Sequence, residues 1–430
     1  MRFCFARVWL FCAAALALSA CGNPSGPYTA AGSTAAPTAP ERSDTSGYQV
    51  IYRFPGRAGG ALPASGLVTL DGQLYGTTSS GGNGCDNDQC GTVFVTNADG
   101  STHVLFNFNS LNGAFPQASL LALKGKLYGT TEAGGKYAYS DVPTGTVFAL
   151  TIAGQQHTLV NFRGTDGGTP MANVVALDDV LYGTTEYGGK YTSPSGTCGT
   201  VFKVTPSGKH SVLYNFDCIR PSTDGYAPTA GLVPYKGVLY GTTTEGGAHG
   251  AGTVYSITPD GKERVVYSFA GGHDGGDPAE GLIVYNDEFY GATPVGGAYY
   301  LGTIFAVSPS GKKRIVYSFK GTRKDGILPN SVIEVDGKLY GTTYLGGSHP
   351  CAMIRSGCGI IYALTTSGTE TILHDFAGGT DGRYPTGALT EMNGSLYGVT
   401  EQGGGGSGNC YYTRSSFGGC GTIFTIAPIK

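Results

Sequence analysis

Six acidic or amide side chains recur at one position of a repeated sequence, and together they could hold a cation. Each lies four residues before a proline, and the set is Asn112, Asp166, Asp224, Asp274, Asp325 and Asp381. A ring of such oxygen ligands near a central opening would suit a hard cation. However, a glycine follows each of them, and Asp-Gly commonly forms a turn in which the side chain bonds its own backbone. This regular pairing favours the turn.

A second group of acids, the glutamates that follow the Thr-Thr pairs, raises the question of catalysis. Two carboxylates flanking a sugar are the catalytic pair of glycosidases. The recurrence of these glutamates at nearly equivalent positions favours a loop-closing role instead. The seven histidines are scattered, and none has a Ser or Cys partner in a nucleophile-elbow setting. We therefore predict no catalytic residue, no metal site and no cofactor; the glutamates are Glu132, Glu186, Glu245 and Glu401.

Tyrosines gather in the variable loops of the repeats and are the candidate ligand-binding residues. Tyrosine supplies flat apolar area and a hydroxyl at small entropic cost, which suits contact with a glycan or a protein. The alternative is that these side chains pack against their own loops. The candidates are Tyr137, Tyr139, Tyr187, Tyr191, Tyr299, Tyr300, Tyr411 and Tyr412.

A repeated unit determines which elements carry these residues. Each unit contains four short stretches rich in Val, Ile, Tyr, Phe and Thr, joined by hairpin-type turns, as is typical of β-strands. Four-stranded sheets repeated about every 50 residues predict an all-β fold, a seven-bladed β-propeller of four-stranded blades. The unit, Leu-Tyr-Gly-Thr-Thr with small variations, begins at Leu74, Leu127, Leu181, Leu239, Phe289, Leu339 and Leu396.

The order of the strand types predicts how the ring closes. A strand of the fourth type, residues 49–54, precedes the first repeat, whereas the chain ends on a third strand, residues 421–426. We expect these two segments to pair and complete the last blade, which removes two open sheet edges. In such blades, the links between strands two and three share one rim with the crossovers between blades. That rim carries every long insertion, and loops on a rigid scaffold are where function concentrates.

The N-terminus predicts export and a lipid anchor. Residues 1–20 have the charged start, short apolar core and small residues of a signal peptide. Leu18-Ser19-Ala20-Cys21 resembles the lipobox of bacterial lipoproteins, which implies cleavage before Cys21 and lipidation of that residue. Gly22 after the cysteine implies the outer membrane. Residues 21–47 are then a lipidated cysteine and a flexible tether, because their composition is poor in apolar residues. Residues 48–430 are the propeller.

Eight cysteines lie in the propeller, an even number that favours disulfides in an exported protein. Their loop positions predict local pairs, because most lie a few residues apart in one loop. No histidine accompanies them at the spacing of a zinc site. The expected pairs are Cys85 with Cys90, Cys198 with Cys218, Cys351 with Cys358 and Cys410 with Cys420.

The repeat Leu-Tyr-Gly-Thr-Thr…Gly-Gly…Gly-Thr-Val-Phe, over roughly residues 60–430, resembles the GloVer tandem repeat of exported bacterial proteins. Members of that family share the repeat and differ in their anchors, and here the anchor looks like a lipid on Cys21. The resemblance therefore assigns neither an activity nor a catalytic residue to this sequence. The single tryptophan lies in the signal segment, so the kelch and Trp-Asp blade signatures are absent.

These features predict a surface-anchored lipoprotein whose monomeric propeller binds a glycan or an envelope protein at the insertion-bearing rim. The net charge of −3 offers no basic footprint for nucleic acid. An extracellular carbohydrate-active enzyme that uses rim carboxylates is the first alternative. A purely structural envelope protein is the second.

Overall fold

The computed structural model describes residues 47–427, with gaps at 86–89, 139–143, 194–195, 220–221, 323–324, 352–355, 406–409 and 411–418. The expected signal, Cys21 and nearly all of the tether lie outside the described residues, as do Tyr139, Tyr411 and Tyr412. In the described part of the chain, no helix is long and apolar enough to cross a membrane.

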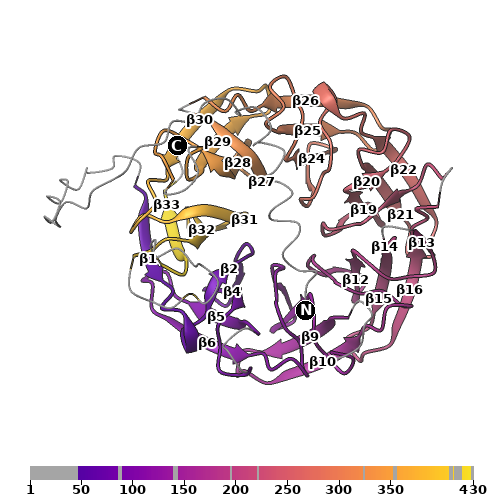
Figure 1. The fold of residues 1–430 in the computed structure, drawn as a ribbon, viewed down its shortest axis with the longest axis horizontal. Helices are drawn as coiled ribbons and strands as arrows, with labels where there is room; N and C mark the ends of the chain where they lie inside the picture. Colours follow the sequence, from indigo (N-terminus) through magenta and orange to yellow (C-terminus); the bar gives the residue numbers. More distant parts are fainter. Residues whose placement is uncertain are drawn as a thin grey trace, which may run out of the picture. The chain divides into compact units, whose positions relative to one another are not determined.

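Seven four-stranded antiparallel sheets form the blades of a closed ring (Figure 1). In the first blade a bulge splits the innermost strand into two pieces, β2 and β3, which both pair with β4. We number the blades 1 to 7 in chain order. From the inside outward, blade 1 contains β2 (Ala61–Pro63) with β3 (Val68–Leu70), β4 (Gln73–Ser80), β5 (Thr92–Thr96) and β6 (Thr102–Asn107); blade 2 contains β7 (Leu121–Leu123), β8 (Lys126–Thr131), β9 (Thr146–Thr151) and β10 (Gln156–Asn161). Blade 3 contains β11 (Val175–Leu177), β12 (Val180–Thr185), β15 (Thr200–Val204) and β16 (His210–Asn215); blade 4 contains β18 (Val233–Tyr235), β19 (Val238–Thr243), β21 (Thr253–Ile257) and β22 (Glu263–Ser268); blade 5 contains β23 (Ile283–Tyr285), β24 (Glu288–Thr293), β25 (Thr303–Val307) and β26 (Lys313–Ser318). Blade 6 contains β27 (Gly326–Val335), β28 (Lys338–Gly346), β29 (Ile360–Thr365) and β30 (Glu370–Asp375); blade 7 contains β31 (Arg383–Met392), β32 (Ser395–Gln402), β33 (Thr422–Ile426) and β1 (Gln49–Arg53).

The smaller elements lie in the links between these strands. They are the two-stranded ribbons of β13 (Thr192–Ser193) with β14 (Gly196–Thr197) and of β17 (Gly225–Tyr226) with β20 (Glu245–Gly246), and the short 3₁₀ turns η1 (Arg57–Gly59) and η2 (Gly272–Asp274).

The predicted closure of the ring is confirmed. β1 pairs antiparallel with β33, from Gln49 opposite Thr425 to Arg53 opposite Thr422. Just before β1, the Tyr48 ring stacks on His374 of blade 6 with a centroid separation of 3.5 Å. The Tyr48 hydroxyl donates to the carbonyl of Asp381 at 2.7 Å. Residues 48–53 therefore join blade 7 to blade 6.

The apolar core is divided into seven clusters, and each cluster fills the space between two neighbouring blades. An aromatic ring at the end of each fourth strand meets, edge to face, an aromatic ring on the third strand of the next blade. Ring centroids in the pair Phe54–Phe94, which joins the last blade to the first, lie 5.0 Å apart. The tyrosine of each Leu-Tyr-Gly unit is buried in these clusters, as its recurrence predicts. Stability thus resides between blades, since no single sheet buries both of its faces.

The glycine of each Leu-Tyr-Gly unit leaves room for the aromatic ring of the third strand. A Cβ atom built on Gly76 would lie 2.5 Å from Cζ of Phe94. No side chain fits at that distance, so this glycine is required for packing.

Each blade also contains one residue in the left-handed region immediately before a proline. In blade 1 this residue is Leu62, with φ of 56°, and its amide donates to the carbonyl of Cys420 in blade 7 at 2.9 Å. The other blades repeat this inter-blade bond, which offsets the backbone strain. The remaining members are Phe115, Thr169, Ala227, Asp277, Leu328 and Tyr384.

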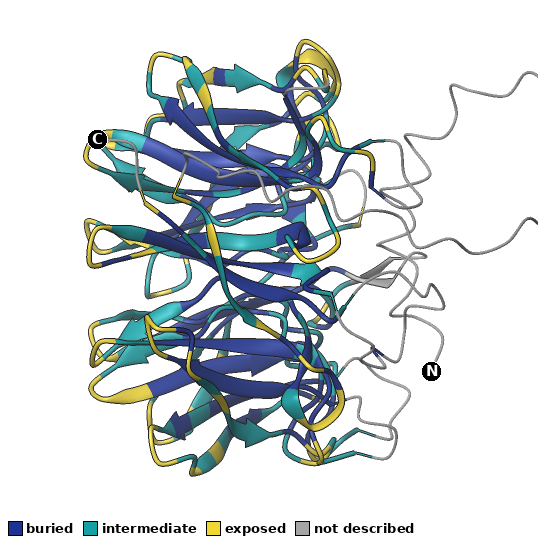
Figure 2. Ribbon diagram, turned by 90° about the vertical axis from the view of Figure 1, so that its left-hand side faces the viewer, coloured by how far each residue is buried: buried dark blue, intermediate teal, exposed yellow. Residues whose placement is uncertain are grey.

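The ring has two different rims. The crossovers between blades and the links between strands two and three lie on one side, which we call the insertion rim. The two short hairpin turns of each blade lie on the other side, the hairpin rim, along the left edge of Figure 2. The structure joins the eight cysteines in the four expected pairs, all at the insertion rim.

Candidate functional site

The crossover acids of the insertion rim fold back on their own crossovers, as the turn interpretation predicts. Oδ1 of Asp166 accepts the amide of Arg163 at 2.9 Å. Four more crossover aspartates accept a backbone amide in the same way. Asp224, Asp274, Asp325 and Asp381 accept the amides of Asp217, Ala270, Lys320 and Ala377, respectively. Among the described residues, no three His, Cys, Asp or Glu side chains converge on a point where a metal could bind.

The glutamates after the Thr-Thr pairs contact neighbouring side chains. Glu132 accepts a hydrogen bond from the Gln117 amide, and Glu401 accepts one from the Tyr344 hydroxyl at 2.8 Å. Burial raises the pKa of Glu401. Glu186 is buried. The two contacts lie within the insertion rim, where Glu132 closes a loop of blade 2 and Glu401 joins blade 7 to blade 6.

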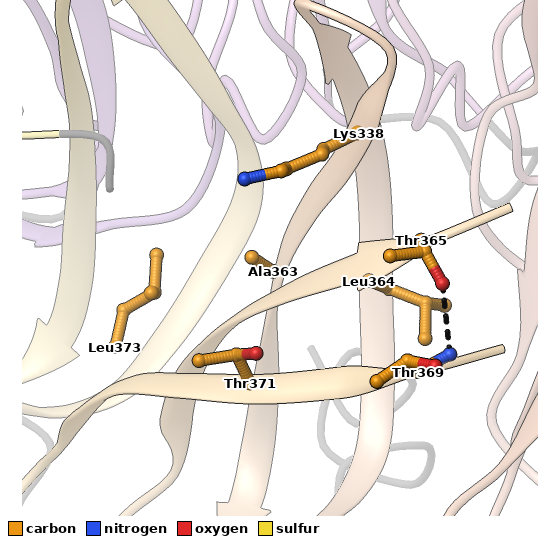
Figure 3. Close-up of a pocket in the computed structure, with 7 residues that line it drawn as sticks. All are labelled: Lys338, Ala363, Leu364, Thr365, Thr369, Thr371 and Leu373. Carbon is orange, nitrogen blue, oxygen red and sulfur yellow. Dashed lines mark hydrogen bonds between the residues drawn. The ribbon is translucent and has the colours of Figure 1, made fainter. Parts of the chain in front are cut away.

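The best-defined pockets lie on the opposite side of the molecule. They are shallow depressions of about 130 and 190 Å³ at equivalent places on blades 6 and 3, near the hairpin rim. Figure 3 shows the first, where the amide of Thr369 donates to the Thr365 hydroxyl across the hairpin. Neither pocket contains a carboxylate. Both are smaller than the roughly 300–1,000 Å³ that sites for small molecules occupy.

The described tyrosine candidates divide into two groups. Tyr137 and Tyr191 are half-buried, and each lies beside the ammonium of the preceding lysine, 5.7 and 5.2 Å from the ring centroids. Tyr187 is also half-buried and pairs through its backbone with Gly168. Tyr137 also faces Arg163, and Tyr191 packs on the core cluster between blades 3 and 4, so these three side chains or backbones have protein neighbours. In contrast, Tyr299 and Tyr300 are 52% and 58% exposed.

Tyr300 pairs with His273, which lies in η2 on the crossover from blade 4 to blade 5, and with the adjacent exposed residue Tyr299 we call these residues the aromatic patch. The centroids of the Tyr300 and His273 rings are 5.1 Å apart, and the Tyr300 hydroxyl lies 3.4 Å from Nε2 of the histidine. His273 is exposed, so all three rings are accessible from solvent. The patch is placed by the link between β24 and β25, on the insertion rim.

The backbone of Tyr300 is strained, and a comparison with blade 4 shows why this matters. The links 247–252 and 297–302 have the same length. In each link, the backbone amide of the fourth residue donates to the carbonyl of the first. The fourth residue is Gly250 in blade 4, with φ of 79°, and Tyr300 in blade 5, with φ of 62°. A tyrosine thus occupies a position whose backbone suits glycine, at a cost of about 1–2 kcal/mol. Because its side chain is exposed, burial does not offset that cost.

Sequence reasoning included Tyr299 and Tyr300 among the candidates but missed the contribution of His273. The signal that would have found the patch was the alignment of the two links, which puts Tyr300 opposite Gly250.

Comparisons with known proteins establish the family of this chain but no activity. A gluconolactonase from Xanthomonas campestris is 13% identical over 94% of this chain and 99% of its own, with a TM-score of 0.43. A puromycin hydrolase is 13% identical over 78% of this chain and 50% of its own, with a TM-score of 0.48. A luciferin-regenerating enzyme is 11% identical over 89% of this chain and 95% of its own, with a TM-score of 0.42. No curated protein sequence matches the chain.

One family model matches residues 32–197 and 191–412, which together cover most of the sequence, and it describes the tandem repeat on which the blades are built. The chain belongs to the Gloeobacter/Verrucomicrobia repeat family.

Proposed function

We propose that this protein is a cell-envelope binding module that recognises a glycan through the aromatic patch of its insertion rim. The observation that carries the proposal is Tyr300, which is strained, exposed and located where the neighbouring blade has glycine. Local strain that the fold does not need is characteristic of functional positions.

The chemistry of the patch suits a sugar better than a protein. Exposed aromatic rings offer flat apolar faces for the C–H faces of a sugar ring, and the tyrosine hydroxyls and the imidazole offer hydrogen bonds. A stable protein interface buries about 800 Å² on each partner around an apolar centre. The other large exposed apolar side chains of the described rim are Leu111 and Ile219, which lie on the crossovers that follow blades 1 and 3. They belong to other crossovers than the patch, so they do not give it the apolar centre of a protein interface.

A glycan array tests this proposal. The propeller should bind a restricted set of oligosaccharides, and Tyr299→Ala with Tyr300→Ala should weaken binding at least about fivefold, since each aromatic contact contributes about 0.5–1.5 kcal/mol. Ile152→Ala is the matched control, because Ile152 is 50% exposed on the hairpin rim. Equal binding by the double variant, or retention of the chain by an envelope protein but by no glycan, would refute the proposal.

The location of the protein forms the second part of the proposal. A lipid on Cys21 would hold the propeller at the bacterial envelope, and residues 22–47 would serve as its tether. Four disulfides support an extracytoplasmic location, because such bonds persist in oxidising compartments. Cys21→Ser should move the protein from the membrane fraction to the soluble fraction. A variant that remains in the membrane fraction would exclude the lipid as the anchor.

A further inference from the structure

Three consecutive blade interfaces share one polar arrangement near the outer edge of the ring. A tyrosine on the fourth strand of one blade contacts the crossover aspartate that follows it. The first residue of the fourth strand of the next blade completes the group. This third residue is Glu263 between blades 3 and 4, Lys313 between blades 4 and 5, and Glu370 between blades 5 and 6.

The interface between blades 4 and 5 is an ordinary buried ion pair. Nζ of Lys313 donates to Oδ1 of Asp274 at 2.7 Å, and the Tyr267 hydroxyl lies 2.9 Å from both carboxylate oxygens. The Lys313 side chain is only 3% exposed. One positive and one negative charge meet here, so the group is neutral as it stands.

The interface between blades 5 and 6 has a carboxyl group where the lysine would be. The Tyr317 oxygen lies 2.8 Å from Oε2 of Glu370 and 3.2 Å from Oδ2 of Asp325. The two carboxyl groups also contact each other. Asp325 accepts the amides of Lys320 and Gly326, each at 2.7 Å, so both of its oxygens already have a hydrogen-bond donor.

Counting hydrogens shows that this group is one proton short unless Glu370 carries one. Tyr317 has a single hydroxyl hydrogen and can donate it to only one carboxylate. If it donates to Asp325, its oxygen can only accept from Glu370. Oε1 of Glu370 is also buried and has no hydrogen-bond partner among the described residues. A buried oxygen without a partner disfavours the charged form of the carboxyl group.

The interface between blades 3 and 4 has the same three residue types, but here the aspartate also has a buried oxygen, Oδ1 of Asp224, without a hydrogen-bond partner in the described structure. The Tyr214 hydroxyl donates to Oδ2 of Asp224 at 2.8 Å and is also hydrogen bonded to Glu263. The amide of Asp217 donates to the same Asp224 oxygen at 3.0 Å. Oε1 of Glu263 is buried without a hydrogen-bond partner in the described structure.

We propose that Glu263 and Glu370 each keep a proton in the folded protein, so that two of its blade interfaces are held together by shared protons and weaken as the pH rises. These two proton-sharing interfaces lie on either side of the ion-paired interface of Lys313 and Asp274, and both should make the folded ring more stable at acidic pH. This inference is independent of ligand binding at the aromatic patch.

The electrostatic surroundings agree with this reading of the geometry. Burial first, and then the charge of Asp224, raise the pKa of Glu263 to about 7, although the hydrogen bond from Tyr214 and the charge of Arg264 oppose the shift. Burial and Asp325 likewise raise the pKa of Glu370 to about 7, against the hydrogen bond from Tyr317 and the charge of Lys320. The other titratable groups facing the two sites are Asp217, Tyr191 and Tyr255 at the first, and Tyr362 at the second. Burial also raises the pKa of Asp224.

The sign of the pH dependence follows from linkage. The pKa of each glutamate is higher in the folded state, about 7, than its ordinary value of 4.5. The folded state therefore binds more protons between these two values, and stability falls as the pH rises across this window. The stabilisation is fully present below pH 4.5, is lost as the pH passes about 7, and changes no further above that.

Urea unfolding between pH 4.5 and 9 tests the proposal with the full propeller. The urea midpoint of the wild type should fall as the pH rises to about 7 and then level off. Below pH 7, the slope of the free energy of unfolding against pH should include the uptake of up to about two protons on folding. Glu263→Gln with Glu370→Gln mimics the protonated side chains and should remove that part of the slope. Glu391→Gln, on an exposed side chain, is the matched control and should leave the slope unchanged.

Two results would overturn the proposal. One is a double variant with the wild-type slope. The other is wild-type protein whose stability at pH 8 is restored by millimolar Ca²⁺, because the paired carboxylates would then hold a cation. Should the double variant fail to fold, infrared spectroscopy of the wild type decides. A band of protonated carboxyl groups that is present at pH 6 and lost at pH 9 supports the proposed protons on Glu263 and Glu370, and its absence at pH 6 refutes them.

Discussion

Replacing Tyr300 by glycine should make the protein more stable while removing half of the exposed tyrosine surface of the aromatic patch. The variant gives blade 5 the residue that blade 4 has at the equivalent position, where φ is 79°. The space around Gly250 is open, so no packing contact is lost or gained there through a side chain. Most exposed tyrosines would give the opposite result, because glycine makes the unfolded chain more flexible.

The magnitude follows from two opposing contributions. Relief of the left-handed conformation returns about 1–2 kcal/mol. The added flexibility of the unfolded chain costs about 0.5–1 kcal/mol. Loss of the His273 contact is small because the Tyr300 ring is 58% exposed. The net gain is about 0.5 kcal/mol. Tyr299→Gly lacks the strain relief, since Tyr299 has no positive φ, and should lose about 0.5–1 kcal/mol.

The difference between the two variants is the quantity to measure, because it cancels the shared cost of glycine. Urea unfolding at one pH should separate Tyr300→Gly from Tyr299→Gly by about 1–2 kcal/mol, with wild type between them. Gly250→Tyr, the reverse change in blade 4, should destabilise the protein. Equal destabilisation by both glycine variants would mean that Tyr300 is not strained, and the main argument for its function would fail.

Three further predictions concern the ring itself. Tyr48→Ala should cost about 2 kcal/mol, because it removes a half-buried ring stacked on His374 and a bond between blades; a wild-type midpoint would contradict this contact. Lys313→Ala should cost about 3 kcal/mol by leaving Asp274 unpaired, whereas Lys236→Ala, at an exposed ion pair, should leave the urea midpoint unchanged. Similar midpoints for the two lysine variants would refute the buried pair. Serine in place of Cys198 and Cys218, which are 20 residues apart, should cost about 3 kcal/mol, more than the same change at Cys85 and Cys90, which are 5 apart. The reverse order would rule out the chain-entropy reasoning.

Much of the fold could be predicted from the sequence because its repeats are regular. Seven copies of Leu-Tyr-Gly fixed the number of blades, and the surplus strands at the two ends predicted the pairing of β1 with β33. The cysteine pairs followed from their positions in single loops or across one hairpin. Each of these inferences depends on residues close in sequence or on identical positions in different repeats.

The features on which the two proposals depend were harder to see in the sequence, for two physical reasons. The strain at Tyr300 is a property of the backbone, which appears in sequence only when its link is aligned with that of Gly250. The proton-sharing groups join residues of neighbouring blades, such as Tyr317 and Glu370, which are 53 positions apart. Such contacts depend on how adjacent blades are staggered, and no motif within one repeat records this.

Hydrogen exchange of the propeller, with and without an oligosaccharide that it binds on the array, tests most directly where that ligand lies. Binding at the aromatic patch should slow exchange in the crossover 270–276 and in the link 296–302, and leave the hairpin turn at 152–155 unchanged. Protection confined to the hairpin rim, or to insertion-rim loops of other blades, would contradict the account.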